Sequence, residues 1–480
     1  MTMKMARFLI AALLLVPAWA ASLDEPTRKL SREILQELIE INTTDSSGST
    51  TVAAEAMRAR LLAAGFPSAD VTVLGPNARK GNLVARLRAA RAGGAKPILI
   101  IGHLDVVEAR RSDWTTDPFH LVEQGGYFDG RGTQDMKGAD AIMVTTLMRF
   151  AREGYRPDRD IILALTADEE GGTSNGVNWL LQQHRGLVDA DFALNPDSGG
   201  VTTESGRPLD VEVASTEKLY ADFELKATNP GGHSSLPVPD NAIYHVADAL
   251  ARLERAVFPF ELNAVTRAYF ERLAQVESAP TTADIRGMLA QPPDPAAIAR
   301  LGRVAQFNAL VRTTCVATRL EAGHANNALP QSARAIVNCR ILPGHTAEEV
   351  RLRLVSIVAD PAVSVRHISD LTGEITDHAP LDKPLAPVAL RSDVLAPLER
   401  LAAQFWPGAP VVPTMETGAS DSKYTNAAGI PSFGFSALAV DRGDVRAHGK
   451  DERLRVSSYY DGVDFYYRYL KELTSQAAAQ

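Results

Sequence analysis

Four short motifs between residues 102 and 200 contain residue types that bind metal ions or transfer protons. Gly-His-Leu-Asp spans 102–105, and Gly-Thr-Gln-Asp-Met-Lys-Gly spans 132–138. Thr-Ala-Asp-Glu-Glu-Gly-Gly follows at 166–172, and Asn-Pro-Asp-Ser-Gly-Gly follows at 195–200. Each motif alone is typical of a solvated loop or turn. Their ordered succession favours one shared site built from a histidine and several carboxylates.

Three of these motifs follow short apolar runs, at 98–101, 161–165 and 192–194. Such runs are typical of buried strands in an α/β sheet. Apolar residues at helical spacing over 24–41 and a long helical stretch over 136–153 indicate helices between the strands. We therefore predict an α/β fold, with a mostly parallel sheet and helices on both faces. Ligands gather at the carboxyl ends of such strands, where the motifs lie.

The spacing of the polar residues indicates which roles they can take in the site. Asp105 lies two residues after His103 and can accept the ring N–H that a metal ion does not use. Glu169 and Glu170 are adjacent, so one can bind metal while the other faces a substrate. Crowded carboxylates repel one another unless cations neutralise them. Mixed His and carboxylate ligands suit zinc better than magnesium, so we predict a pair of metal ions, with zinc the better fit.

The order of predicted elements changes near residue 214. From there strand, helix, strand, strand, helix and strand follow in turn, which is the split βαβ pattern of a ferredoxin-like α+β domain. We expect this second domain at 214–372, inserted between two parts of the domain that carries the motifs, at 21–213 and 373–480. Its stretch 258–308 is irregular and partly helical. Plain scaffold is our favoured interpretation of that stretch, and a wall of the substrate pocket is the alternative.

The first twenty residues have the features of a secretory signal peptide. Lys4 and Arg7 precede the apolar run 8–16, and a small-x-small cleavage signal ends at Ala20. A membrane anchor is the weaker alternative because this run is too short to span a bilayer. We expect residues 1–20 to be removed and the protein to be exported, to the periplasm or outside the cell, with no membrane span.

Export bears on the only two cysteines of the chain, Cys315 and Cys339. They lie in apolar runs at 311–320 and 333–342, and a hairpin centred near Asn327 would place them opposite each other. A cross-strand disulfide and two buried thiols are both open. Cysteine spacing typical of zinc sites is absent, so His and carboxylates must hold any metal. The net charge of −8 argues against nucleic acid or an anionic membrane as partner.

In order and content, the motifs resemble those of the di-zinc exopeptidase and amidohydrolase family. That family includes glutamate carboxypeptidases, aminoacylases, acetylornithine deacetylases, desuccinylases and carnosinases. The resemblance covers roughly residues 30–475 and implies two Zn²⁺ per chain, for which Co²⁺ or Mn²⁺ could substitute. It implies five metal ligands, which are His103, Asp135, Glu170, Asp197 and His448. In it, Asp135 bridges the two ions and precedes a cis peptide bond.

The resemblance also divides these ligands between the two ions. His103 and Asp197 would bind one zinc, and Glu170 and His448 the other. His448 lies in Ala-His-Gly-Lys-Asp-Glu at 447–452, which is similar to the family's closing His-Gly-x-Asp-Glu motif.

Two catalytic roles follow from the same resemblance. Asp105 would orient His103, and Glu169 would be the general base that takes a proton from water and delivers it to the leaving amine.

The resemblance implies that the inserted domain is a lid and dimerisation domain of a catalytic domain, and it carries further family motifs. Gly-Gly-His-Ser-Ser at 231–235 resembles a lid motif whose histidine, His233 here, polarises the scissile carbonyl in the active site of the partner subunit. Asn327 begins an Asn-x-x-Pro turn that supplies another contact in trans. Arg340 matches an arginine that grips a substrate carboxylate, with a surface arginine as the alternative. Gly418 lies in a Gly-rich substrate loop, and the set implies a homodimer.

Together these features predict an exported zinc-dependent peptidase of the exopeptidase or carboxypeptidase type. It would cleave the amide bond of a dipeptide, a C-terminal residue or an N-acyl amino acid. An N-acyl-amino-acid amidohydrolase is the alternative. An inactive dimeric scaffold is a remote alternative, since the predicted ligands and base are all present. A phosphate-ester hydrolase is the weakest interpretation because no phosphate-cradling Gly-rich loop opens a helix.

Overall fold

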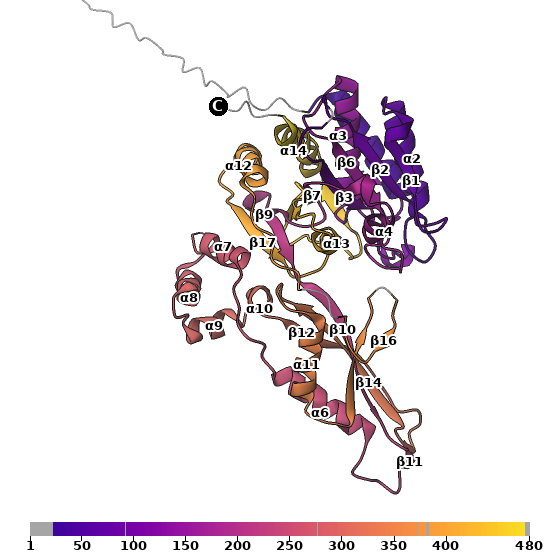
Figure 1. The fold of residues 1–480 in the computed structure, drawn as a ribbon, viewed down its shortest axis with the longest axis vertical. Helices are drawn as coiled ribbons and strands as arrows, with labels where there is room; N and C mark the ends of the chain where they lie inside the picture. Colours follow the sequence, from indigo (N-terminus) through magenta and orange to yellow (C-terminus); the bar gives the residue numbers. More distant parts are fainter. Residues whose placement is uncertain (1–22, 92, 276, 371, 381–383, 476–480) are drawn as a thin grey trace, which may run out of the picture.

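The computed structural model describes residues 23–475, apart from 92, 276, 371 and 381–383. The predicted signal peptide therefore lies outside the described residues. Two sheets account for most of the strands, and Figure 1 shows them as separate upper and lower bodies. Among the described residues, no helix combines the length and the apolar character that crossing a membrane requires.

The larger sheet contains ten strands within the described chain. In spatial order nine of them are β1 (Val71–Leu74), β2 (Asn82–Leu87), β6 (Ile161–Thr166), β3 (Ile98–His103), β7 (Phe192–Asn195), β18 (Ser432–Gly434), β9 (Arg207–Glu217), β8 (Gly200–Glu204) and β19 (Ala439–Asp441). Strand β17 (Val411–Glu416) pairs with β9 in parallel. The central run β6–β3–β7–β18 is parallel throughout. The expected mostly parallel α/β sheet is confirmed.

Helices cover both faces of this sheet. On one face lie α1 (Glu25–Glu40), α2 (Thr50–Ala63), α3 (Lys137–Glu153), α12 (Ser392–Phe405) and α14 (Val456–Thr474). On the other lie α4 (Gly176–Gln183), α5 (Arg185–Val188) and α13 (Ser422–Ala427). Strand β3 shows why its run is wholly apolar: Ile98 and Ile100 enter one core, and Leu99 and Ile101 enter the other. A strand buried on both faces needs apolar residues at every position.

The second sheet is antiparallel, in the order β12 (Thr314–Ala322), β14 (Ser332–Ile341), β10 (Leu219–Thr228), β15 (Val363–Ile368) and β16 (Ile375–Thr376). Helices α6 (Ala242–Arg255) and α11 (Ala347–Val358) pack on it around a core of their own. In chain order β10, α6, β12, β14, α11 and β15 form the expected ferredoxin-like pattern. Thr346 and Glu349 form the capping box that begins α11.

The strands of the two sheets reach slightly past the expected domain boundaries. Strand β9 stays paired with β17 as far as Glu217, beyond residue 213. Strand β16 adds residues 375–376 to the second sheet, beyond residue 372. The division of the chain into domains remains a prediction.

The stretch 258–308 is more regular than expected. It forms α7 (Ala264–Leu273), α8 (Ala279–Leu289), α9 (Pro295–Leu301) and α10 (Ala305–Val311). The predicted strand 311–320 was therefore placed too early, because α10 continues to Val311 and β12 begins at Thr314. Leu310 and Val311 instead join a core that the four helices share with Val412 and Met415 of β17.

The remaining elements are short. They are β4 (Val122–Gln124), β5 (Tyr127–Asp129) and β20 (Arg453–Arg455) in a three-stranded sheet, β11 (Gly232–His233) paired with β13 (Ala328–Leu329), and 3₁₀ turns at Ser68–Asp70 and Arg111–Asp113. Cys315 and Cys339 lie opposite each other on β12 and β14 and form a disulfide. Of the two open alternatives for the cysteines, the structure has the disulfide.

Candidate metal centre and active site

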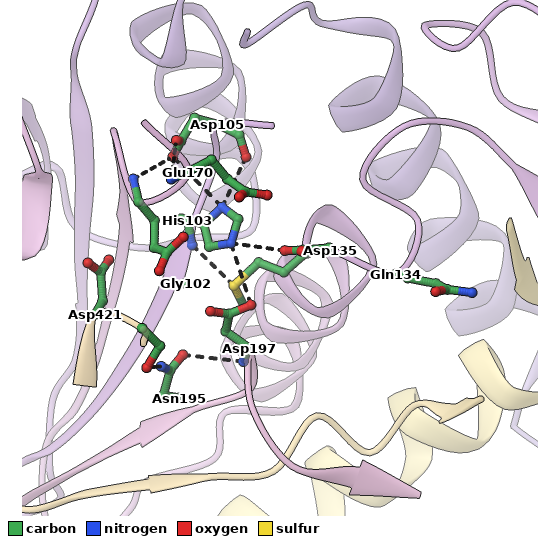
Figure 2. Close-up of polar contacts among 12 residues, drawn as sticks. Gly102, His103, Asp105, Gln134, Asp135, Glu170, Asn195, Asp197 and Asp421 are labelled. Atoms are coloured by element: carbon green, nitrogen blue, oxygen red, sulfur yellow. Dashed lines mark hydrogen bonds and ion pairs between the residues drawn. The ribbon is translucent and has the colours of Figure 1, made fainter. Parts of the chain in front are cut away.

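The predicted metal ligands come from loops at one edge of the larger sheet. His103 ends β3, Glu170 follows β6, and Asp197 follows β7. Because these three strands are neighbours and parallel, their carboxyl ends meet at the same edge. Asp135 precedes α3, and its peptide bond to Met136 is cis, as the resemblance implies. Figure 2 shows these side chains pointing toward one another.

The predicted ligands form two groups that share Asp135. Nε2 of His103 lies 3.2 Å from Oδ1 of Asp135 and 3.5 Å from Oδ1 of Asp197. Nε2 of His448 lies 3.1 Å from Oδ2 of the same Asp135 and 2.8 Å from Oε2 of Glu170. Within each group, the ligand atoms all lie within 4.8 Å of one another. The two oxygens of Asp135 therefore face different groups, which is the geometry of a bridging carboxylate.

The polar atoms at this site fit a metal pair. Nε2 of His103 and Oδ1 of Asp135 are both buried without a hydrogen-bond partner among the described residues. A buried polar atom without a partner is costly, and metal coordination removes that cost. Hydrogen bonds with Asp135 and then Glu170 raise the pKa of His448 to about 10. The carboxylates thus hold a proton there that a metal ion would displace.

Asp105 contacts its neighbours differently from the prediction. Nδ1–H of His103 donates to the main-chain carbonyl of Asp105 at 3.0 Å, whereas the nearer carboxylate oxygen is 3.7 Å away. The carboxylate instead accepts the main-chain N–H groups of Glu169 at 3.2 Å and Glu170 at 2.9 Å. The carboxylate points toward the loop that follows β6 because two main-chain N–H donors lie there. Asp105 therefore orients His103 mainly through its backbone and holds the Glu169–Glu170 loop through its carboxylate.

Glu169 belongs to neither ligand group. Burial, and after it the negative charge of Asp197, raises the pKa of its carboxyl well above the ordinary value. A carboxyl group that holds a proton readily beside the ligand atoms has the chemistry of a general base that later acts as an acid.

Glu452 is a functional candidate that sequence reasoning missed. Its fully buried carboxylate accepts the main-chain N–H groups of Gly132, Gln134 and Asp135, at 2.7–3.1 Å. It also pairs with Arg131 at 2.7 Å. The sequence feature that could have identified Glu452 is its position four residues after His448, in the same closing motif. Glu452 shapes the loop that presents the shared ligand.

The lid residues lie away from this centre within one chain. His233 is exposed on β11, and the main-chain N–H of Ser234 donates to the carbonyl of Asn327 at 3.1 Å. Figure 1 shows β11 at the end of the second sheet remote from the larger sheet. The structure therefore brings His233 and Asn327 together, but not to the metal ligands of their own chain.

Arg340 and Gly418 also stand apart from the two ligand groups. The Arg340 guanidinium lies over the Tyr220 ring, 4.7 Å from its centroid, and lines a cavity of about 580 Å³ on the second sheet. Gly418 is exposed in the loop between β17 and α13. Asp421 of the same loop accepts a hydrogen bond of 2.6 Å from Asn175 and is drawn beside the ligands in Figure 2.

Comparison with known proteins places the chain in a family. The model of Peptidase family M20/M25/M40 matches residues 99–472. A probable carboxypeptidase S-like 2 of Dictyostelium discoideum is 29% identical over 384 residues, which cover 78% of this chain and 71% of the relative. The N-fatty-acyl-amino acid synthase/hydrolase PM20D1 of Homo sapiens is 28% identical over 386 residues, which cover 78% and 74%.

Solved structures share the fold. An M20 family metallo-carboxypeptidase from Sulfolobus solfataricus superposes with a TM-score of 0.69 at 17% identity, covering 94% of this chain and 100% of that one. Human carnosine dipeptidase 1 gives a TM-score of 0.61 at 13% identity, covering 94% and 97%. The chain belongs to Peptidase family M20/M25/M40 and is a metal-dependent peptidase or amidohydrolase.

Proposed function

We propose that this protein is an exported hydrolase with two Zn²⁺ ions per chain. It cleaves the amide bond of a dipeptide, a C-terminal residue or an N-acyl amino acid. The observation that carries the proposal is the placement of Asp135, whose two carboxylate oxygens face separate ligand groups. The disulfide between Cys315 and Cys339 supports export, because such bonds persist in oxidising compartments.

His103 and Asp197 would hold one ion, Glu170 and His448 the other, and Asp135 both. Zinc bound there would lower the pKa of a water molecule and polarise the scissile carbonyl. Glu169 takes the proton of the attacking water and delivers it to the leaving amine. Asp105 supports this step because its carboxylate holds the main chain of Glu169.

We further propose a homodimer in which each lid serves the partner's site. His233 and Asn327 are exposed, adjacent to each other and far from the ligands of their own chain, which leaves them available to a second copy. His233 would stabilise the oxyanion of the tetrahedral intermediate. Arg340 would bind the substrate carboxylate, and Gly418 would line the substrate loop.

An N-acyl-amino-acid amidohydrolase is the second candidate within the same chemistry. It is favoured by the relatives named N-fatty-acyl-amino acid synthase/hydrolase, which are 28% identical to this chain.

A hydrolysis screen tests the function and separates the two candidates. Protein stripped with a chelator and reloaded with zinc is assayed for amine release from dipeptides and from N-acyl amino acids. We expect activity that requires zinc and about two ions per chain in wild type. Hydrolysis of neither substrate set by the zinc-loaded protein would refute the proposal.

The Glu169→Gln variant tests the general base. We expect turnover to fall by about 10²–10⁴-fold, because only the proton transfer is removed, while the metal content stays unchanged. Substantial activity in this variant would exclude Glu169 as the base. Arg340→Ala, assayed beside it, should raise KM for carboxylate-bearing substrates, and an unchanged KM would refute the proposed grip.

A further inference from the structure

A cavity of about 630 Å³ opens beside two of the proposed ligands, Asp135 and Asp197. Part of its lining comes from the four-helix stretch 258–308. Tyr269 and Leu273 of α7 and Phe307 of α10 line it. A group of the substrate next to the scissile amide can therefore reach this part of the lining from the metal centre.

Two carboxylates line the floor of this cavity. Asp210 and Glu212 lie on the same face of β9, whereas Val211 and Val213 between and beyond them enter the core on the other face. Oδ1 of Asp210 is buried without a hydrogen-bond partner among the described residues, and the carboxylate of Glu212 forms no hydrogen bond or ion pair with any of them. Burial, and then the charge of Asp210, raises the pKa of Glu212 to about 7.

Tyr269 is an independent sign that the cavity takes a polar ligand group. Only 5% of this residue is exposed, and its ring packs against Phe270 with the centroids 5.2 Å apart. Its hydroxyl forms no hydrogen bond with any described residue, although nearby charges of Glu212 and Asp210 act on it. A hydroxyl that has no protein partner, on a residue that lines a cavity, is suited to contact a ligand there.

Asp210 and Glu212 do not form a further metal site in this cavity. Among the described residues, the two groups around Asp135 are those whose ligand atoms converge closely enough to hold a metal. Asp210 and Glu212 belong to neither. A volume of about 630 Å³ instead matches an organic group, since small-molecule sites fall in this range.

The lining residues also disfavour a substrate group that is wholly apolar. A hydrocarbon chain would pack against Leu273 and Phe307, but it would exclude water from Asp210 and Glu212 without satisfying either carboxylate. Arg442 also lines the cavity, but its charge acts on Asp210 and not on Glu212, so the carboxylates still disfavour an anionic group. A cation on an apolar stem meets both parts of the lining, because its methylene groups contact the apolar wall and its charge pairs with the carboxylates.

We propose that this cavity is a substrate subsite for an organic cation, an ammonium or guanidinium group, held by Asp210, Glu212 and the hydroxyl of Tyr269. The proposal rests on the proposed amide hydrolase function and concerns its substrate class. It also gives the stretch 258–308 a role in the substrate pocket, where the sequence favoured plain scaffold.

The test uses two matched substrate pairs with zinc-loaded protein. N-(6-aminohexanoyl)-leucine and N-heptanoyl-leucine differ by an ammonium against a methyl group on the acyl side of the amide. N-acetyl-lysine and N-acetyl-2-aminoheptanoate differ in the same way on the amine side. We expect kcat/KM to favour the cationic member by about tenfold or more in one pair, which identifies the side that enters the cavity.

Variants link this preference to the named residues. Glu212→Gln should abolish most of the preference, and Tyr269→Phe should reduce it. Glu271→Gln removes an exposed carboxylate from the same helix as Tyr269 and should retain it. Equal kcat/KM within both pairs, or a preference that survives Glu212→Gln, would overturn the proposal.

A binding measurement separates this subsite from the proposed reaction. Calorimetry on zinc-loaded Glu169→Gln protein compares the same pairs without turnover. Tighter binding of one cationic member, lost in the Glu169→Gln/Glu212→Gln double variant, supports the subsite even if the wild type hydrolyses nothing in the panel. Equal binding within both pairs refutes the subsite while leaving amide hydrolysis to its own assay.

Discussion

The main-chain N–H of Asp135 donates a hydrogen bond of 3.1 Å to the buried carboxylate of Glu452, 317 residues further along the chain. The same carboxylate accepts hydrogen bonds from Gly132 and Gln134 and pairs with Arg131. Glu452 therefore holds the whole loop that presents the shared ligand. Mutation of residues that orient ligands in this way typically costs about 10–100-fold in metal affinity or activity.

We predict that Glu452→Gln weakens metal binding and lowers kcat/KM by about 10–100-fold. The amide replaces one acceptor oxygen with a donor that faces main-chain N–H groups, so the loop must shift. Metal affinity by competition with a chelator is the direct measurement. Glu254→Gln, at an exposed carboxylate of α6, is the matched control. Wild-type metal affinity in Glu452→Gln would show that the loop keeps its shape without this carboxylate.

Mixing two inactive variants tests whether the lid acts in trans. His233→Ala keeps its metal centre and base but lacks the lid histidine, whereas Glu169→Gln keeps the lid and lacks the base. In a mixed dimer, the centre of the first chain meets the lid of the second, so we expect recovery of roughly a quarter of the wild-type sites after random reassortment. The measurement is turnover after co-refolding. Absence of recovery in verified mixed dimers would place His233 in its own chain's site or outside catalysis.

Dimer formation itself should be separable from metal binding. The ligands His103, Asp135 and Asp197 all come from one chain. We therefore expect a variant that dimerises poorly to bind zinc normally yet lose turnover. Sedimentation, metal content and kcat measured on the same preparation check this. A monomeric variant with wild-type turnover would contradict the proposed sharing of sites.

The disulfide should stabilise the second sheet, in which it joins β12 and β14. It joins positions 24 residues apart, and closing a loop of that size restricts the unfolded chain enough to contribute about 3 kcal/mol. We expect the double variant Cys315→Ser/Cys339→Ser to lose stability by this order in urea unfolding. Added reductant should have the same effect on the wild type and none on the variant. Equal stability of oxidised and reduced wild type would contradict the expectation.

The stability of the inserted domain should also fall in acid because of Glu348. Hydrogen bonds from Arg351, 2.7–2.8 Å long, lower the pKa of its carboxyl to about 2, from an ordinary value of 4.5. Because the folded pKa lies below the unfolded one, the stabilisation is present above about pH 4.5 and is lost as the pH falls toward 2. Urea unfolding across this range should show a loss of roughly 1–3 kcal/mol.

A matched pair of variants tests whether Glu348 causes the loss of stability in acid. Glu348→Gln should flatten the pH profile between 4.5 and 2, whereas Glu374→Gln, an exposed carboxylate of the same region, should leave it as in the wild type. Identical profiles for the two variants would remove Glu348 from the explanation.

The order of strands and motifs predicted the α/β class and a cluster of polar residues at strand ends, and the family resemblance supplied the set of five candidate ligands. Strand periodicity and Gly-flanked polar clusters are local properties, and parallel strands bring their carboxyl ends together wherever the chain runs between them. The structure brings His103, Asp135, Glu170, Asp197 and His448 into two groups, although 345 residues separate the first from the last.

Other features were decided only by tertiary packing. Asp105 was expected to hold His103 through its carboxylate, but that carboxylate turns to the main chain of Glu169 and Glu170 because two N–H donors lie there. In the sequence, Glu452 is only the last residue of a motif. In the structure it is buried against residues 131–135, which supply its hydrogen-bond and ion-pair partners. Spacing along the chain places a residue at a strand end, but only the packed neighbours determine where its side chain points.

The stretch 258–308 shows most clearly what the sequence predicts and what only the packed structure determines. Its Pro-rich and Ala-rich composition predicted an irregular, partly helical structure. It folds into four helices because their apolar residues share a core with Val412 and Met415, about 100 residues later. That packing places Tyr269 in the lining of the cavity that Asp210 and Glu212 also line. The sequence alone determined which residues could do chemistry and at which strand ends. The tertiary structure decided what surrounds them, because burial and contact between distant segments exist only in the folded chain.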